Sequence, residues 1–143
     1  MRDIFVTHDW RNTPEQEAAL ALLDQAYGLD WRNFGTPWYD PTVDWHTPEG
    51  LAFLDEILST QVAPATCVLV LAGLCVDSQR GRFWVERTVA LARRHGLPVL
   101  GLPARGSDAA PAELAHLADV WVPWDHRQLA AAIERTAPAE TAA

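Results

Sequence analysis

The sequence predicts an α/β sandwich around a parallel sheet of four or five strands. Two short apolar runs, at 67–72 and 97–102, flank an amphipathic segment at 83–95. Apolar runs of this length that end at Gly or Pro are typical of strands buried on both faces. A strand, a helix and a second strand in close succession indicate a right-handed parallel crossover. Such sheets bind ligands at the carboxyl ends of their strands.

The other predicted elements continue the alternation of strands and helices. Residues 3–7 (DIFVT) form a strand, and the capping box at 13–16 (TPEQ) begins a helix that extends to about Tyr27. Thr47, followed by proline, caps a second helix. After the central crossover we expect a loop at 102–111, a short helix at 112–117, a strand at 119–123 and a last helix at 126–136.

We expect one domain, residues 1–136, followed by a frayed tail at 137–143. A chain of 143 residues can bury a substantial core. No apolar run approaches the roughly 20 residues of a membrane span, and the opening MRDIFV predicts no signal peptide. The two cysteines, Cys67 and Cys75, make no disulfide framework. These observations favour a cytoplasmic protein.

The charge of the chain excludes several functions. The net charge is −8, with 11 acidic residues against 3 arginines in residues 1–60. A nucleic-acid-binding protein needs a basic face, so no nucleic acid partner is expected.

The sequence contains no lysine and no Gly-rich phosphate loop, which rules out a Schiff-base lysine and a P-loop. The five histidines lack the spacing of a metal site.

The segment at 29–46 is the least regular part of the sequence. It holds three of the seven tryptophans beside prolines and aspartates. Long loops of this kind tend to be functional. Trp31 lies in WRNF, which resembles a strand, so core packing is its stronger interpretation. Trp38 and Trp45 are candidates for stacking on an adenine or for a partner surface.

Several stretches in their order along the chain resemble the TIR-like superfamily. They are DIFVTHDW, then WRNFGTP followed by YDP, CVLVLAG, FWVERTVALARRHGLPVLGL and ADVWVPWDHRQLAAAI. Together they cover residues 3–134 and are similar to the small stand-alone bacterial branch, the ThsB-like proteins of Thoeris antiphage systems. The resemblance implies a flavodoxin-like three-layer sandwich.

The resemblance also implies an activity. Members of the family cleave the nicotinamide–ribose bond of NAD and release ADP-ribose-type signals, often cyclic ones. NAD would then be a substrate, and no permanently bound cofactor is expected. In Thoeris systems the signal activates a separate effector protein, and family members commonly self-associate.

The position of the family's catalytic glutamate is occupied by a different residue here. That glutamate follows a tryptophan in a W-V-x-x-E pattern, in which Trp84 and Val85 match and position 88 is Thr88. Cleavage of an N-glycosidic bond creates positive charge on the sugar, which a carboxylate stabilises and a hydroxyl does not. Glu86 lies two residues earlier, about 200° around the helix, and is expected to point away.

Other carboxylates are candidates for the missing role. Asp9 follows the first strand together with His8, and Asp77 follows the third. Asp9 either reaches a bound nucleotide or caps the local backbone. His8 is either a general base or a hydrogen-bonded structural residue.

Nucleotide-binding candidates surround the start of the central helix. Arg80 and Arg82, with Arg87 beyond, either hold a diphosphate or form a solvated helix end. Trp10, Gly73 and Trp84 are the further binding candidates. A nucleophilic hydrolase is disfavoured, because Ser78 lacks an elbow motif and Cys75 lacks an evident base.

Three hypotheses therefore remain open. The first is an NAD glycohydrolase or ADP-ribose cyclase in which another acid replaces the glutamate. The second is a catalytically inactive TIR-like binding or assembly module, which Thr88 favours. The third is a different enzyme on the same sheet, such as a deoxyribosyltransferase-like protein or a nucleotide hydrolase. The fold alone does not separate them.

Overall fold

A single parallel sheet of five strands forms the centre of the protein. The structure is a computed structural model that describes residues 2–11, 13–26, 28–33, 43–76 and 78–136. The spatial order of the strands is β2-β1-β3-β4-β5, and every neighbouring pair is parallel. This is the strand order of flavodoxin-like folds, so the predicted class is confirmed. The strands are β1 (Arg2–Val6), β2 (Trp31–Asn33), β3 (Cys67–Leu71), β4 (Val99–Leu102) and β5 (Val120–Trp121).

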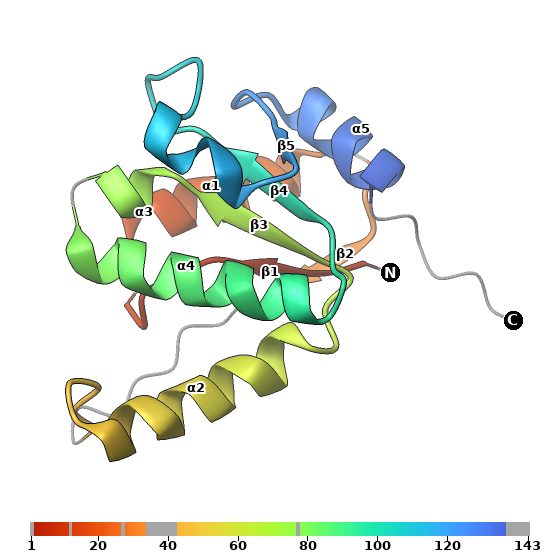
Figure 1. Cartoon of the computed structure of the whole chain (residues 1–143). Helices are drawn as coiled ribbons and strands as arrows, with labels where there is room; N and C mark the ends of the chain where they lie inside the picture. Colours follow the sequence, from red (N-terminus) through yellow and green to blue (C-terminus); the bar gives the residue numbers. More distant parts are fainter. Residues whose placement is uncertain (1, 12, 27, 34–42, 77, 137–143) are drawn as a thin grey trace, which may run out of the picture.

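Helices cover both faces of the sheet, which gives three layers (Figure 1). On one face α1 (Pro14–Gln25) contacts α5 (His126–Thr136), and on the other α2 (Pro48–Val62) contacts α4 (Gln79–Arg94). A short helix, α3 (Gly73–Val76), follows β3, and a 3₁₀ helix, η1 (Ala112–Leu117), precedes β5. The connections that leave β1 and β3 therefore cross to opposite faces.

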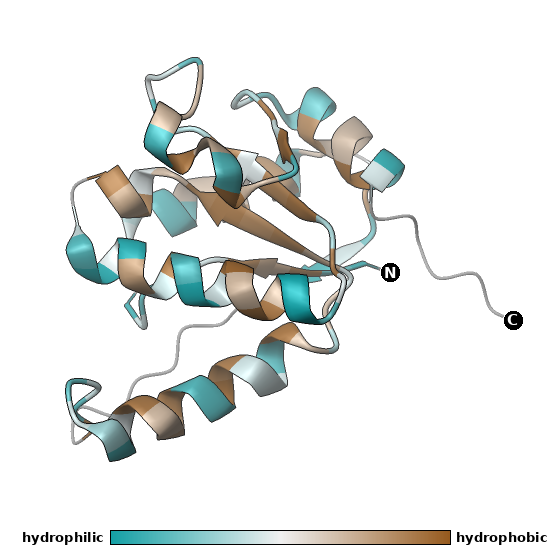
Figure 2. Cartoon of the chain, in the orientation of Figure 1, coloured by the Kyte–Doolittle hydropathy of each residue, from teal (hydrophilic) through white to brown (hydrophobic). Residues whose placement is uncertain are grey.

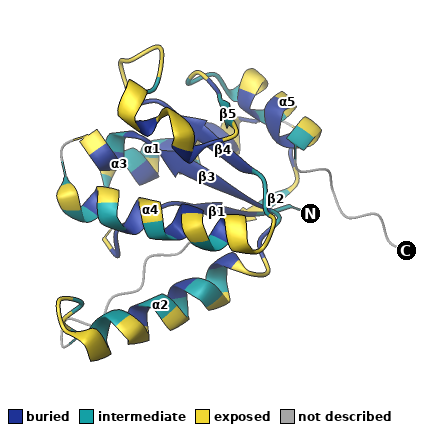
Figure 3. Cartoon of the chain, viewed as in Figure 1, coloured by how far each residue is buried: buried dark blue, intermediate teal, exposed yellow. Residues whose placement is uncertain are grey.

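The core is centred on β3. All five of its residues are buried, as expected of a strand covered on both faces. The apolar colouring follows the sheet and the inner sides of the helices (Figure 2), and the same surfaces are the buried ones (Figure 3). The aromatic side chains Phe5 and Trp84 are fully buried among the aliphatic residues.

Hydroxyl side chains cap three of the helices. Thr13 accepts a hydrogen bond from the Gln16 amide, and Thr47 accepts one from the Gly50 amide, as the sequence predicts. The prediction for α4 was too short, because the helix begins at Gln79 and not at residue 83. Ser78 caps α4.

The β3–α4 connection and the start of β4 also differ from the prediction. Helix α3 was not expected. The predicted strand at 97–102 begins only at Val99, because the Leu97 amide donates to the Ala92 carbonyl at the end of α4. Gly96, with φ +68°, allows this left-handed helix end.

Candidate functional site

The residues that follow β1 form a buried polar segment at the carboxyl edge of the sheet. His8, Asp9 and Trp10 are each at most 2% exposed. Thr7 fixes the start of this segment, because its hydroxyl accepts the Leu71 amide at 3.0 Å and joins it to the end of β3. In open sheets of this order, ligands bind where neighbouring connections diverge, which here is between β1 and β3.

His8 is a neutral imidazole in this setting. Burial lowers its pKa to about 4, while the Gln61 side chain and the charge of Asp9 offset part of that effect. Its Nδ1 accepts the Trp10 amide at 3.1 Å, so a neutral ring carries its proton on Nε2. A group with so low a pKa is a poor general base at neutral pH. The structural interpretation of His8 is therefore the better one.

Asp9 is held by two arginines through different atoms. Its Oδ2 pairs with the Arg11 guanidinium. Its main-chain carbonyl accepts Arg80 Nε at 3.0 Å, across 71 residues of sequence. Its Oδ1 is buried and has no hydrogen-bond partner among the residues that the structure describes. One oxygen of this carboxylate is thus neutralised locally, and the other is left with unused acceptor capacity.

Trp10 combines an unusual backbone with an unpaired indole. Its φ of +68° is uncommon for a residue other than glycine, and such conformations cluster at functional sites. Its ring packs edge-on against Trp84, with centroids 5.5 Å apart. The Nε1 atoms of both indoles are buried and have no hydrogen-bond partner within the described residues. Trp45, at the start of the α2 connection, also packs edge-on against Trp84, at 5.7 Å.

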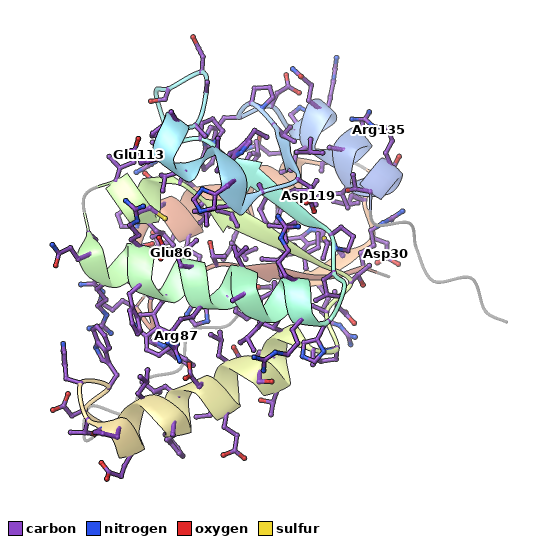
Figure 4. All side chains as sticks on the ribbon, in the orientation of Figure 1. Asp30, Glu86, Arg87, Glu113, Asp119 and Arg135 are labelled. Carbon is purple, nitrogen blue, oxygen red and sulfur yellow. The ribbon has the colours of Figure 1, made fainter. Side chains whose placement is uncertain are left out.

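Positions 86 and 88 lie on opposite sides of α4. Thr88 is fully buried, and its hydroxyl donates to the Trp84 carbonyl at 2.8 Å. Glu86 is exposed and accepts Arg82 Nε at 2.8 Å (Figure 4). The expectation that Glu86 points away from Thr88 is confirmed. In this structure neither residue places a carboxylate beside Asp9.

Glu15 lies against Gly73 at the carboxyl end of β3 and pairs with Arg105, and the sequence analysis singled out neither residue as part of a site. A Cβ at Gly73 would lie 2.4 Å from Glu15 Oε2. Glu15 Oε1 accepts Arg105 Nε at 2.8 Å. In the sequence Glu15 belongs to the capping box, and no local pattern marks Arg105, which lies 90 residues away. The ion pair of Arg11 with Asp9 was not predicted either, although a spacing of two residues makes such a pair possible.

The three arginines near the start of α4 do not form one cluster. Arg80 alone contacts the β1 segment. Arg82 pairs with Glu86, while Arg87 pairs with Asp55 of α2 (Figure 4). Arg82 and Arg87 therefore form separate ion pairs, both distinct from the contact of Arg80 with the β1 segment.

The remaining candidates have structural roles or lie outside the described residues. Ser78 is the cap of α4. Cys67 and Cys75 are free and buried, and burial raises their thiol pKa values to about 12 and about 11. Trp38, Asp77 and the predicted tail fall outside the described residues. Trp31 packs against the core, half-buried.

Within the described ranges, no group of three or more His, Cys, Asp or Glu residues could hold a metal ion.

A groove on the outer surface lies away from this edge. It has a volume of about 360 Å³ and lies between α2 and the second half of α4. Arg87 and Arg94 line it together with Asp55 and Glu56, so its charges balance. Nothing in this groove resembles the buried polar segment after β1.

Comparison with known proteins does not assign the chain to a family. No protein-family model matches the chain, and no curated protein matches it. Among the helices that the structure describes, none has the length and apolar character needed to cross a membrane.

Proposed function

We propose that this chain is a TIR-like signalling domain that binds an NAD- or ADP-ribose-type nucleotide at the carboxyl edge of β1 and β3. One observation carries the proposal: Asp9 Oδ1 and the Nε1 atoms of Trp10 and Trp84 are buried and have no partner among the described residues. More than nine in ten buried polar groups in proteins are paired. An unpaired acceptor at Asp9 and unpaired donors at Trp10 and Trp84, whose rings pack together, suit a ribose, whose hydroxyls both donate and accept.

Asp9 is the carboxylate that this proposal assigns to the chemistry. Loss of nicotinamide from NAD leaves an oxocarbenium-like ribose, and a carboxylate nearby stabilises its positive charge. Asp9 Oδ1 is the oxygen available for that role, because Oδ2 pairs with Arg11. Thr88 would supply no charge, and its hydroxyl already bonds within α4. The product would be an ADP-ribose-type signal.

The biological setting follows from the resemblance of the sequence. Stretches similar to stand-alone TIR-like proteins of Thoeris systems favour a role in bacterial antiphage defence. In that role NAD is consumed as substrate, a separate effector protein reads the product, and self-association controls activity.

The test is nicotinamide release from NAD by concentrated protein, compared across variants. We expect turnover by the native chain and a loss of about 100- to 1,000-fold in Asp9→Asn, because the amide keeps the shape but not the charge. Glu113→Gln removes an equivalent charge from the exposed surface of η1 and is the matched control. Unchanged turnover in Asp9→Asn would contradict the assignment of Asp9.

A catalytically inactive module is the second candidate, and position 88 favours it. The family's carboxylate is replaced by Thr88, and Glu86 faces solvent. This candidate predicts that the native chain binds ADP-ribose without releasing nicotinamide, and that Thr88→Glu gains turnover. Absence of both binding and turnover in all variants would exclude NAD-type chemistry altogether.

A further inference from the structure

We propose that Gly73 and Arg105 form a phosphate-binding subsite whose place the Glu15 carboxylate takes in this structure. The inference rests on the proposed function in one respect, since it takes the phosphate to be that of a nucleotide. The contacts of Glu15 with Gly73 and with Arg105 are features of the structure in their own right.

The contact between Glu15 and Gly73 joins the connection after β1 to the connection after β3, and these two connections cross to opposite faces of the sheet. Glu15 lies in the first turn of α1, which continues from β1, and Gly73 follows β3. A Cβ at Gly73 would meet Glu15 Oε2 at 2.4 Å and Cδ at 2.6 Å, so the carboxylate lies directly on the glycine backbone. Any larger residue at position 73 would push it away. The Glu15 carboxylate thus lies between the β1 and β3 connections, which is the region where sheets of this order bind ligands.

The surroundings of this carboxylate would suit a phosphate better. Oε1 accepts Arg105 Nε at 2.8 Å, whereas Oε2 is buried and accepts no hydrogen bond from the described residues. Arg105 comes from the loop after β4, and its side chain is 48% exposed. A guanidinium binds phosphate through two parallel hydrogen bonds, so a phosphate can engage more of Arg105 than this carboxylate does.

The present contact is weak enough to be exchanged. Ion pairs of half-exposed arginines contribute little to stability. A buried carboxylate oxygen without a donor is unfavourable for the conformation that holds it. A phosphate that displaces Glu15 would therefore replace a poorly satisfied anion with a better satisfied one, and Glu15 would move toward solvent at the start of α1.

The test measures binding of inorganic pyrophosphate and of ADP-ribose by isothermal titration calorimetry. Glu15→Gln removes the competing charge, and we expect both probes to bind about five-fold more tightly. Arg105→Ala should weaken both at least about ten-fold. The double variant should bind no more tightly than Arg105→Ala alone, because the two residues act on one subsite. Arg135→Ala removes the same charge from the last turn of α5 and should change neither affinity.

The outcomes separate this inference from the proposed function. ADP-ribose binding that Arg105→Ala leaves unchanged would overturn the subsite and leave the proposed function standing. Pyrophosphate binding that depends on Arg105, without any ADP-ribose or NAD binding, would support the subsite and overturn the proposed function. Glu15→Ala is a second variant with the same expected direction as Glu15→Gln. No pyrophosphate binding by the native chain or by either Glu15 variant would overturn the subsite.

Discussion

His8 shows how burial sets the chemistry of a single side chain. The same imidazole at the surface would titrate near neutral pH. Here desolvation holds its pKa near 4, and the Trp10 amide uses Nδ1 as an acceptor. The neighbouring Asp9 is also buried, but it pairs with Arg11, whose side chain is half exposed. The segment after β1 therefore carries a neutral ring and a paired carboxylate close together.

The lowered pKa of His8 predicts acid sensitivity. The unfolded chain binds a proton at this histidine below about pH 6.5, and the folded chain binds one only near pH 4. The unfolded state therefore holds more protons between these values, and stability falls as the pH is lowered through this window. The lowered pKa corresponds to a loss of at most about 3 kcal/mol in the free energy of unfolding, of which about 2 kcal/mol is lost by pH 5.

Urea unfolding at pH 7.5 and pH 5 measures this effect. The His8→Gln variant should lose most of the difference between the two pH values. His116→Gln, on the exposed surface of η1, should retain it. An equal pH dependence in the native chain and in His8→Gln would show that the folded state protonates His8 as readily as the unfolded chain does.

At the scale of the elements, the junction of α3 and α4 depends on a very close approach. A Cβ at Gly81 would lie 1.9 Å from the carbonyl oxygen of Leu74 in α3. Gly81 also donates its amide to the capping hydroxyl of Ser78. This junction determines where α4 begins, and it directs Arg80 toward Asp9. The sequence showed the helical pattern of α4 but not this contact.

Gly81→Ala is expected to destabilise the protein although alanine is the better helix former. Helix propensity alone would favour alanine by up to about 1 kcal/mol. The clash with the Leu74 backbone should outweigh this gain and cost about 1–3 kcal/mol in the free energy of unfolding. Gln79→Ala in the same turn, which is exposed, should change stability by less than about 0.5 kcal/mol. A Gly81→Ala variant as stable as the native chain would mean that α3 moves freely relative to α4.

For the whole molecule, burial is concentrated in the middle of the sheet. β3 is fully buried between β1 and β4, whereas the edge strands β2 and β5 have three and two residues. The carboxyl edge of β1 and β3 therefore lies on buried strands in the middle of the sheet. The candidate site thus has a buried base, while the Arg105 side of it lies on an exposed loop.

Native-state hydrogen exchange should reproduce this gradient. Amides of β3, and those of β1 and β4 paired with it, are expected to open only with global unfolding. The amides of β2 and β5 should exchange through local opening at free energies several kcal/mol lower. Equal protection of β2 and β3 in exchange measured by NMR would contradict the gradient.

The sequence by itself determined the features that depend on neighbours along the chain. Apolar runs predicted the positions of β1, β3 and β4, and Thr13 and Thr47 predicted where two helices begin. Both signals depend only on residues that are close in the sequence. The opposite orientations of Glu86 and Thr88 followed from helix geometry alone.

Only the tertiary structure decided which distant groups meet at the candidate site. The bond from Arg80 to the Asp9 carbonyl spans 71 residues, and the pairing of Glu15 with Arg105 spans 90. Trp10 meets Trp84 only because β1 lies beside β3 and α4 returns across them. Such contacts arise from the order of strands in the sheet, and that order leaves no periodic pattern in the residues that it brings together.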